Sequence, residues 1–130
     1  MRGASALQGL LQEMPGRPVR VFAVWEPVLP TDIGPPTRSV TSRMKDARVE
    51  QYWDPGRLLS GRILAASHTV PAFAIFSGQL QAAWDLAAVY PPGSTWPSGA
   101  VPTPVYCGNP VAESIDSLRA RIATTSPSGP

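Results

Sequence analysis

The sequence predicts a single α/β domain in which amphipathic helices alternate with short apolar strands. Three observations favour this fold class: a length of 130 residues, a hydrophobic content of 43%, and apolar positions whose spacing changes from segment to segment. A chain of this length can bury one hydrophobic core but not two. We therefore expect one domain over residues 1–123. A disordered tail is expected over residues 124–130, where no apolar residue anchors the chain.

The chain begins with a predicted helix and a predicted buried strand. Leucines at helical spacing, starting at Leu7, predict a helix over residues 4–14 that ends at Pro15. Residues 19–24, VRVFAV, are apolar on both faces apart from Arg20. This pattern is typical of a strand in the centre of a mostly parallel sheet.

The next segments are interpreted as helical. Ser39 can cap a short helix that runs to Lys45, and residues 49–53 indicate one more helical turn. Asp54-Pro55 is typical of a helix start, with Asp at the N-cap and Pro in the first turn. Helical spacing continues behind this pair as far as Ala66.

The second half of the chain contains two short strands and a final helix. Residues 70–77, VPAFAIFS, fit either a strand or a buried helix, whereas residues 84–90, WDLAAVY, predict a strand. Residues 105–107 can return antiparallel to that strand. Asn109-Pro110 is a second cap-plus-proline start, and an apolar stripe over residues 111–122 predicts the last helix.

Composition excludes several classes of function. A net charge of +2 with 15% charged residues argues against charge-driven binding to nucleic acid. One cysteine and one histidine exclude an internal disulfide, a CxxC redox pair and a zinc site built from these residues. We expect no cofactor and no metal. No apolar run reaches 18 residues and no signal segment follows Met1, so we expect no membrane partner and a cytoplasmic location.

Three sequence motifs extend the fold prediction. They are VRVFAVWEPVLPTD at residues 19–32, QYWDPGRLLSGRI at residues 51–63, and AWDLAAVYPPGSTW at residues 83–96. In these motifs the chain resembles a family of small bacterial thioredoxin-like proteins, over about residues 4–122. The resemblance implies a thioredoxin-like fold: a mixed sheet of three to four strands flanked by helices.

The chain departs from this family at its N-terminus. Family members begin with a strand and a cysteine-containing turn, whereas here the chain starts at Met1, where that turn would end. The resemblance therefore implies a fold truncated at the N-terminus, either by loss or as a natural short form such as a mobile gene cassette product. Thioredoxin chemistry needs a low-pKa thiolate and a resolving partner. We expect no dithiol-disulfide oxidoreductase activity.

A loose match to thioredoxins also occurs later in the chain. Thioredoxins carry a cis-proline before their third strand, and Val70-Pro71 has a similar position. Without the redox cysteines, a cis bond there would be a relic, and a trans proline in a loop is the ordinary alternative.

Acidic and aromatic residues follow the predicted strands, where ligands of open α/β sheets bind. They are Trp25, Glu26, Asp32, Trp53, Asp54, Trp84 and Asp85. Together they could form a pocket for a cationic or sugar-like small molecule. The alternative is structural, because carboxylates beside loops usually cap backbone amides and Asp54 already has that role.

Two further residues carry potential chemistry. Cys107 would be a reactive thiol if it were exposed near the start of the last helix, and a small hydrophobe if it were buried. His68 could act as a general base with Ser67, or simply lie in a surface loop. We interpret the protein as a binding or assembly module without redox chemistry. The alternative is a small enzyme or thiol carrier that uses Cys107 or the acidic and aromatic pocket.

A second copy of the chain is the expected partner. A thioredoxin-like sheet without its first strand has unpaired backbone groups and apolar surface at the vacant place. A homodimer can cover that place symmetrically, by facing sheets or by exchanging an element. Alternatively, residues 70–77 could fill it as a substitute strand of the same chain.

Overall fold

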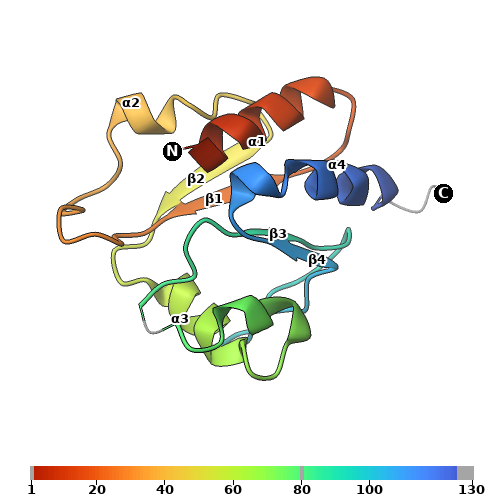
Figure 1. The fold of residues 1–130 in the computed structure, drawn as a ribbon. Coiled ribbons are helices and arrows are strands. Elements are labelled where there is room, and N and C mark those ends of the chain that lie inside the picture. The colour runs from red at the N-terminus through yellow and green to blue at the C-terminus, as the bar shows by residue number, and fades with distance from the viewer. Residues whose placement is uncertain (1, 80, 126–130) are drawn as a thin grey trace.

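A computed structural model describes residues 2–79 and 81–125 and shows a mixed α/β fold, as the sequence predicts (Figure 1). No helix in these two ranges is long and apolar enough to cross a lipid bilayer. The elements in chain order, with η for a 3-10 helix, are α1 (Arg2–Glu13), β1 (Val21–Trp25), α2 (Arg38–Thr41), β2 (Val49–Trp53), α3 (Leu58–Ala66), η1 (Pro71–Phe76), β3 (Ala87–Val89), β4 (Tyr106–Gly108), η2 (Val111–Glu113) and α4 (Ile115–Thr124).

The four strands form two separate sheets of two strands each. β1 and β2 are parallel, with Val21 opposite Val49, and β3 and β4 are antiparallel, with Ala88 opposite Cys107. Within the described ranges no ladder of hydrogen bonds joins β1 to β3. The expectation of one mixed sheet is therefore corrected, because β1 and β3 face each other in Figure 1 without pairing.

The first half of the chain contains two corrections. Residues 49–53 form β2 and not a helical turn, because their exposure alternates with period two, with Glu50 and Tyr52 on the exposed side. Helix α3 begins at Leu58 and not at Pro55, since Arg57 before it adopts a left-handed conformation with φ of 53°. The short helix expected to start at Ser39 and run to Lys45 corresponds to α2, which has only four residues, and its N-cap is Thr37 and not Ser39.

The ambiguous segment over residues 70–77 is resolved as η1. Its Phe73 and Phe76 are buried against α3, so the alternative of a substitute strand is wrong. The cis peptide bond of the described ranges is Asn109-Pro110, and not Val70-Pro71. The segment after Asn109-Pro110 forms η2 before α4 begins at Ile115, so the final helix starts later than predicted.

Three other expectations are confirmed. Helix α1 covers most of residues 4–14, and β1 overlaps the strand predicted over residues 19–24 but ends one residue later, at Trp25. The predicted antiparallel return is the β3–β4 pair, although β3 is limited to Ala87–Val89. Of the expected tail, Thr124 is still part of α4, and residues 126–130 lie outside the described residues.

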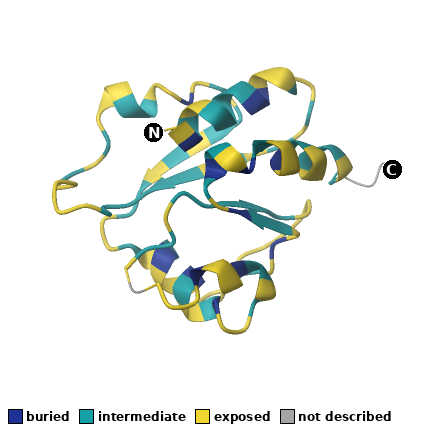
Figure 2. Ribbon diagram, in the orientation of Figure 1, coloured by how far each residue is buried: buried dark blue, intermediate teal, exposed yellow. Residues whose placement is uncertain are grey.

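Six of the eight buried hydrophobic residues in the described ranges form two clusters on opposite faces of the β3–β4 sheet. The first is built around Leu10 of α1, Val111 of η2 and Leu118 of α4, and contacts Ala87, Val89 and Tyr106 of the sheet. The second is built around Ile63 of α3 with Phe73 and Phe76 of η1, and contacts Leu86 and Cys107. All eight buried hydrophobic residues in the described ranges lie outside the strands, and most of the dark blue in Figure 2 is on helical segments.

Arg48 connects the end of α1 to the start of β2. Its guanidinium donates hydrogen bonds to the main-chain oxygens of Leu11 at 2.6 Å, Met14 at 2.7 Å and Arg17 at 3.1 Å. It also pairs with the Asp46 carboxylate at 2.7 Å. These contacts satisfy carbonyls at the C-terminus of α1, which has no further turn of helix to bond them.

Candidate functional site

The structure places the seven predicted site residues in separate settings, and not in one acidic and aromatic pocket. Glu26 and Asp54 meet at the N-terminus of α3. Trp25 and Trp53 lie opposite each other in the β1–β2 register. The remaining three residues lie in the loop after β1 and in the segment before β3: Asp32, Trp84 and Asp85.

Glu26 belongs to a polar bridge centred on Ser60. The Ser60 hydroxyl donates to one carboxylate oxygen of Glu26, and the Ser60 N–H donates to the other at 3.0 Å. The N–H of Ala83 donates to the same hydroxyl at 2.9 Å. Ser60 is only 2% exposed, so this bridge ties the end of β1, helix α3 and the segment before β3 together inside the protein. Sequence reasoning did not single out Ser60, because a serine within a helix pattern carries no signal of its own.

Asp54 acts as a cap for α3. Its carboxylate accepts a hydrogen bond from the N–H of Leu59 at 2.9 Å. Burial alone would raise the pKa of Asp54, but hydrogen bonds from the backbone N–H groups of Leu59 and Leu58 and one with Glu26 bring it below its ordinary value. An ionised carboxylate at a helix N-terminus is stabilising. The structural interpretation of Asp54 from the sequence is therefore the one that the geometry supports.

Asp32 closes the loop after β1. Its carboxylate accepts hydrogen bonds from the N–H of Leu29 at 2.7 Å and of Val28 at 2.9 Å. These two bonds hold the pKa of Asp32 below its ordinary value. The carboxylate thus stabilises its own loop by bonding to backbone N–H groups three and four residues before it.

The two tryptophans of the β1–β2 sheet are partly buried. The indole N–H of Trp25 donates to the side-chain oxygen of Gln51 at 3.0 Å. The Gln51 amide in turn donates to the main-chain oxygens of Thr41 at 3.0 Å and Met44 at 3.1 Å. This chain of hydrogen bonds fixes the α2 loop over one face of the sheet.

Trp84 and Asp85 lie beside the N-terminus of α1. The Asn109 side chain donates to the main-chain oxygens of Trp84 at 2.6 Å and of Asp85 at 3.1 Å. The Asp85 carboxylate approaches Gly3 so closely that a Cβ there would lie 2.6 Å from Oδ1. Glycine is therefore the residue that allows this approach, and Trp84 remains 60% exposed.

Cys107 lies in β4, in the sheet whose two faces are covered by the core clusters. It is partly buried against the cluster of α3 and η1, and burial raises the pKa of its thiol to about 11. A thiol with this pKa is almost entirely protonated at neutral pH, which favours the small-hydrophobe interpretation. His68 does not pair with Ser67, because the Ser67 hydroxyl donates to the main-chain oxygen of Leu64 at 2.7 Å.

The structure contains one exposed aromatic feature that sequence reasoning missed. Phe22 and Tyr52, on neighbouring strands, have ring centroids 6.3 Å apart and are 56% and 50% exposed. The Arg20 guanidinium lies 5.3 Å from the centroid of the Phe22 ring and pairs with Glu50 at 2.6 Å. Reading residues 49–53 as a strand would have revealed this surface, since it places Glu50 and Tyr52 on one face.

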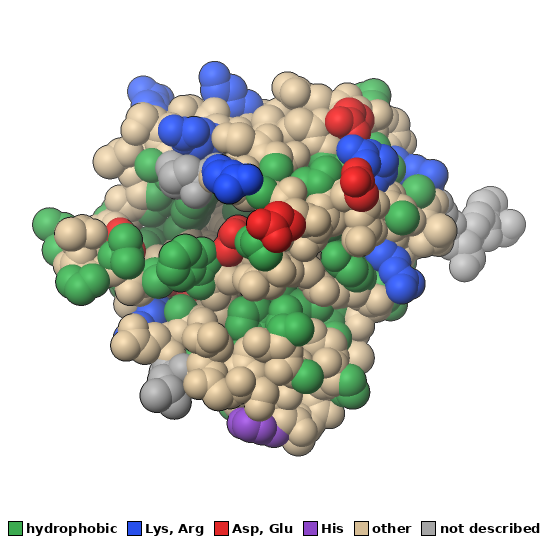
Figure 3. All heavy atoms as spheres, in the orientation of Figure 1, with side chains coloured by type: hydrophobic (Ala, Val, Ile, Leu, Met, Phe, Trp, Pro, Cys, Tyr) green, Lys and Arg blue, Asp and Glu red, His purple; other side chains and the backbone are tan. Residues whose placement is uncertain are grey.

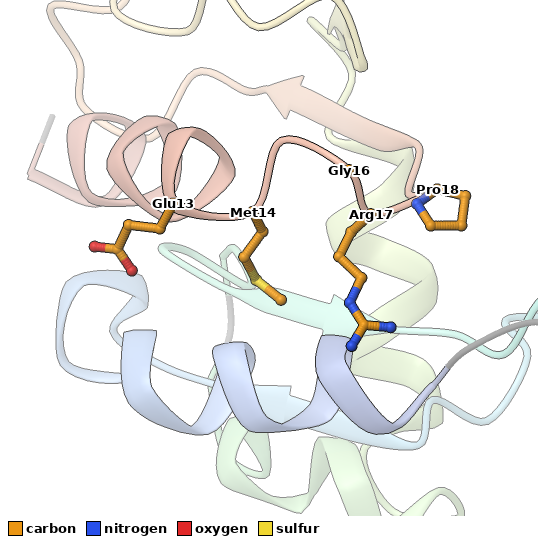
Figure 4. Close-up of a pocket in the computed structure, with 5 residues that line it drawn as sticks. All are labelled: Glu13, Met14, Gly16, Arg17 and Pro18. Carbon is orange, nitrogen blue, oxygen red and sulfur yellow. The ribbon is translucent and has the colours of Figure 1, made fainter.

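A hollow of about 440 Å³ lies at the turn between α1 and β1. Figure 4 shows the side chains of Met14 and Arg17 pointing from this turn toward α4. The hollow contains none of the predicted site residues. Among the described residues, no group of three or more His, Cys, Asp or Glu side chains could hold a metal ion.

Comparisons of the chain with models of protein families, with curated proteins and with solved structures find no match. The functional argument therefore depends on the geometry of the chain itself. That geometry engages Glu26, Asp32 and Asp54 in backbone hydrogen bonds and leaves the face around Phe22 and Tyr52 open.

Proposed function

We propose that this chain is a thioredoxin-like binding or assembly module without redox chemistry, and that it forms a homodimer. The observation that carries the proposal is the exposed face of the β1–β2 sheet, which we call the aromatic face: Arg20, Phe22, Glu50 and Tyr52. The carboxylates and the thiol that an enzyme would use serve the fold instead. The motifs shared with thioredoxin-like proteins support the family relationship, which remains part of the proposal.

A parallel pair of strands is normally covered on both faces, because its connections place helices there. Here the clusters of the core lie against the β3–β4 sheet, and the aromatic face remains exposed. Two aromatic rings side by side on such a surface are typical of an interaction site. The aromatic face therefore supports a partner of substantial apolar character.

A second copy of the chain has the required chemistry. The aromatic face carries one positive and one negative side chain, Arg20 and Glu50, which already lie 2.6 Å apart. Two copies related by a two-fold axis present the same surface to each other. The paired charges cancel, so two such faces can approach without repulsion, and each Arg20 can reach the partner's Glu50.

Light scattering over a concentration series tests the proposal. We expect the mass to rise from 13.8 kDa to twice that value at micromolar concentrations. Tyr52→Ser should keep the protein monomeric, because it removes one ring of the aromatic face. Ile33→Ser, at a loop residue that is 96% exposed, is the matched control and should still dimerise. A wild-type protein that remains monomeric at high micromolar concentration would contradict the dimer.

The alternative function, an enzyme or thiol carrier, makes a different prediction. It requires turnover that depends on Cys107 or on the carboxylates near α3. We expect no reduction of insulin disulfides above the level of a Cys107→Ala control, since the chain holds one cysteine and its pKa is high. Turnover above that control would favour the alternative.

A further inference from the structure

The two sheets leave unpaired strand edges between them. In β1, the N–H of Val21 donates toward β2 at 2.9 Å, and the carbonyl of Trp25 accepts from the residue after β2 at 2.8 Å. A strand in a parallel pair directs alternate residues to its partner. The N–H and C=O groups of Phe22 and Val24 therefore point to the opposite edge of β1, away from β2.

β3 has the same arrangement in the other sheet. It pairs with β4 on one side, and in the described ranges no strand pairs with its other side. Figure 1 shows that this free edge faces β1. Backbone donors and acceptors inside a fold need partners. The geometry of two such edges fits one kind of occupant, namely another extended backbone.

The exposure of β1 and β3 also indicates that their facing edges lack a neighbouring strand. In a finished α/β sheet the central strands are the most buried elements, because helices cover both faces. In this molecule every residue of β1 and β3 retains partial or full exposure, and the buried hydrophobic residues all lie on other segments. Figure 3 shows hydrophobic side chains, in green, gathered across the middle of this face of the molecule, with most basic side chains above them.

Side-chain contacts connect the elements around the two free edges without a strand between them. At the carboxyl end of β1, the bridge from Glu26 through Ser60 to Ala83 connects β1 with the segment before β3. Above the sheets, Glu13 of α1 pairs with Arg119 of α4 at 2.7 Å. The hollow beside Met14 lies at the turn that precedes β1.

We propose that the edges of β1 and β3 accept an extended peptide segment as an added strand. The segment has about five residues, to match β1, and is apolar on both faces, because one core cluster lies on each side of the β3–β4 sheet. A strand inserted between β1 and β3 needs both of its own edges free, and each strand of a folded second copy already pairs along one edge, so the occupant is a separate extended segment. This inference rests on the proposed function, since it names a partner of the same binding module.

Amide hydrogen exchange measured by NMR tests the inference. The probe is a synthetic peptide of five alternating valine and isoleucine residues between terminal lysines, acetylated and amidated. We expect the Phe22 and Val24 amides to exchange rapidly in the free protein, and about tenfold or more slowly with the peptide. The Ala23 amide, which faces β2, should be slow in both states and is the internal control.

Changes in the protein and in the peptide make this test more specific. Val24→Pro removes one donor of the free edge and leaves the ladder to β2 intact, so peptide affinity should fall by about tenfold or more. Val24→Thr keeps the donor and should bind like the wild type. If Val24→Pro does not fold, a peptide N-methylated at alternate residues removes the same hydrogen bonds without changing the protein, and it should fail to bind.

The outcomes separate this inference from the dimer. The inference is supported if the peptide protects Phe22 and Val24 in the monomeric Tyr52→Ser variant, whatever the wild-type mass. It is overturned if the peptide protects neither amide, or if both are already slow in the free monomer. Protection that appears only as protein concentration rises would identify a second copy as the occupant, which overturns the peptide and leaves an assembly function in place.

Discussion

The two sheets of this protein differ in a way that their strand lengths do not suggest. β3 and β4 have three residues each, yet core clusters cover both faces of their sheet. β1 and β2 have five residues each and pair over their whole length, yet the aromatic face of their sheet is exposed. The covered sheet is the shorter one.

This difference shows that the packing of helices, and not the length of a ladder, decides where the core forms. The apolar stripes of α1 and α4 meet over one face of β3–β4, and α3 with η1 covers the other. Hydrogen bonds of Arg48 connect the start of β2 to the end of α1, and the buried Leu11 and Met44 belong to neither cluster. Domains are built from packed layers, and here one layer is complete over only half of the strands.

The largest effect should come from truncating a side chain in the half of the molecule that the core clusters fill around the β3–β4 sheet, which we call the covered half. Phe73→Ala should lower the free energy of unfolding by about 3–5 kcal/mol, because Phe73 is fully buried and the change leaves a cavity. Phe22→Ala, the matched change on the aromatic face, should cost less than about 1 kcal/mol. Urea denaturation followed by circular dichroism measures both. Equal losses would remove the contrast between the two halves.

Thiol labelling compares the same two regions. With its pKa raised to about 11, Cys107 should react with a thiol reagent at pH 8 about 100-fold more slowly than a thiol with the ordinary pKa near 8.5. A Tyr52→Cys change in a Cys107→Ala background places a thiol on the aromatic face and should react rapidly. Labelling in urea gives the reference rate for each protein. Rapid labelling of native Cys107 would show that the covered half opens readily.

The connection between the two halves depends on Ser60. Ser60→Ala removes the hydroxyl shared by Glu26 and Ala83, which leaves buried groups without that partner. We expect a loss of about 1–3 kcal/mol in the free energy of unfolding. Ser39→Ala, where the exposed hydroxyl contacts only Thr37 at 2.8 Å, is the control and should change stability by less than about 0.5 kcal/mol. A Ser60 variant as stable as the control would show that the bridge does not hold the halves together.

The smallest effect concerns the pH dependence of the contact between α1 and β2. Hydrogen bonds from Arg48 lower the pKa of Asp46 from 3.8 to about 2. A lowered folded-state pKa gives stability that is present above the unfolded value and lost as pH falls toward the folded one. Between pH 4 and 2 the wild type should therefore lose stability more steeply than Asp46→Asn. Parallel curves from urea titrations at several pH values would argue against this contribution.

Local patterns in the sequence were sufficient for several elements. The leucine stripe predicts α1, the apolar run predicts β1, and the order of segments predicts the β3–β4 pair. The same patterns failed for residues 49–53 and for the start of α3. A five-residue segment is too short for periodicity to distinguish strand from helix, and the left-handed Arg57 that delays α3 has no sequence signature.

The candidate site was predicted in part. Residue type alone indicated that Asp54 caps a helix, and its carboxylate does accept a hydrogen bond from Leu59 of α3, although Arg57 and not Asp54 holds the N-cap position. The convergence of all seven acidic and aromatic residues was not found, because the premise was one sheet with one carboxyl edge. Ser60 and the aromatic face were missed, since both depend on segments about 30 residues apart: Glu26 with Ser60, and Phe22 with Tyr52.

The sequence by itself determined the α/β class, the absence of a cysteine pair and the position of α1, because these follow from composition and local spacing. Only the tertiary structure decided that the strands divide into two sheets, which face is covered, and which carboxylates are engaged. Those properties depend on contacts between distant segments, and the free energy of such contacts cannot be inferred from any short pattern of residues.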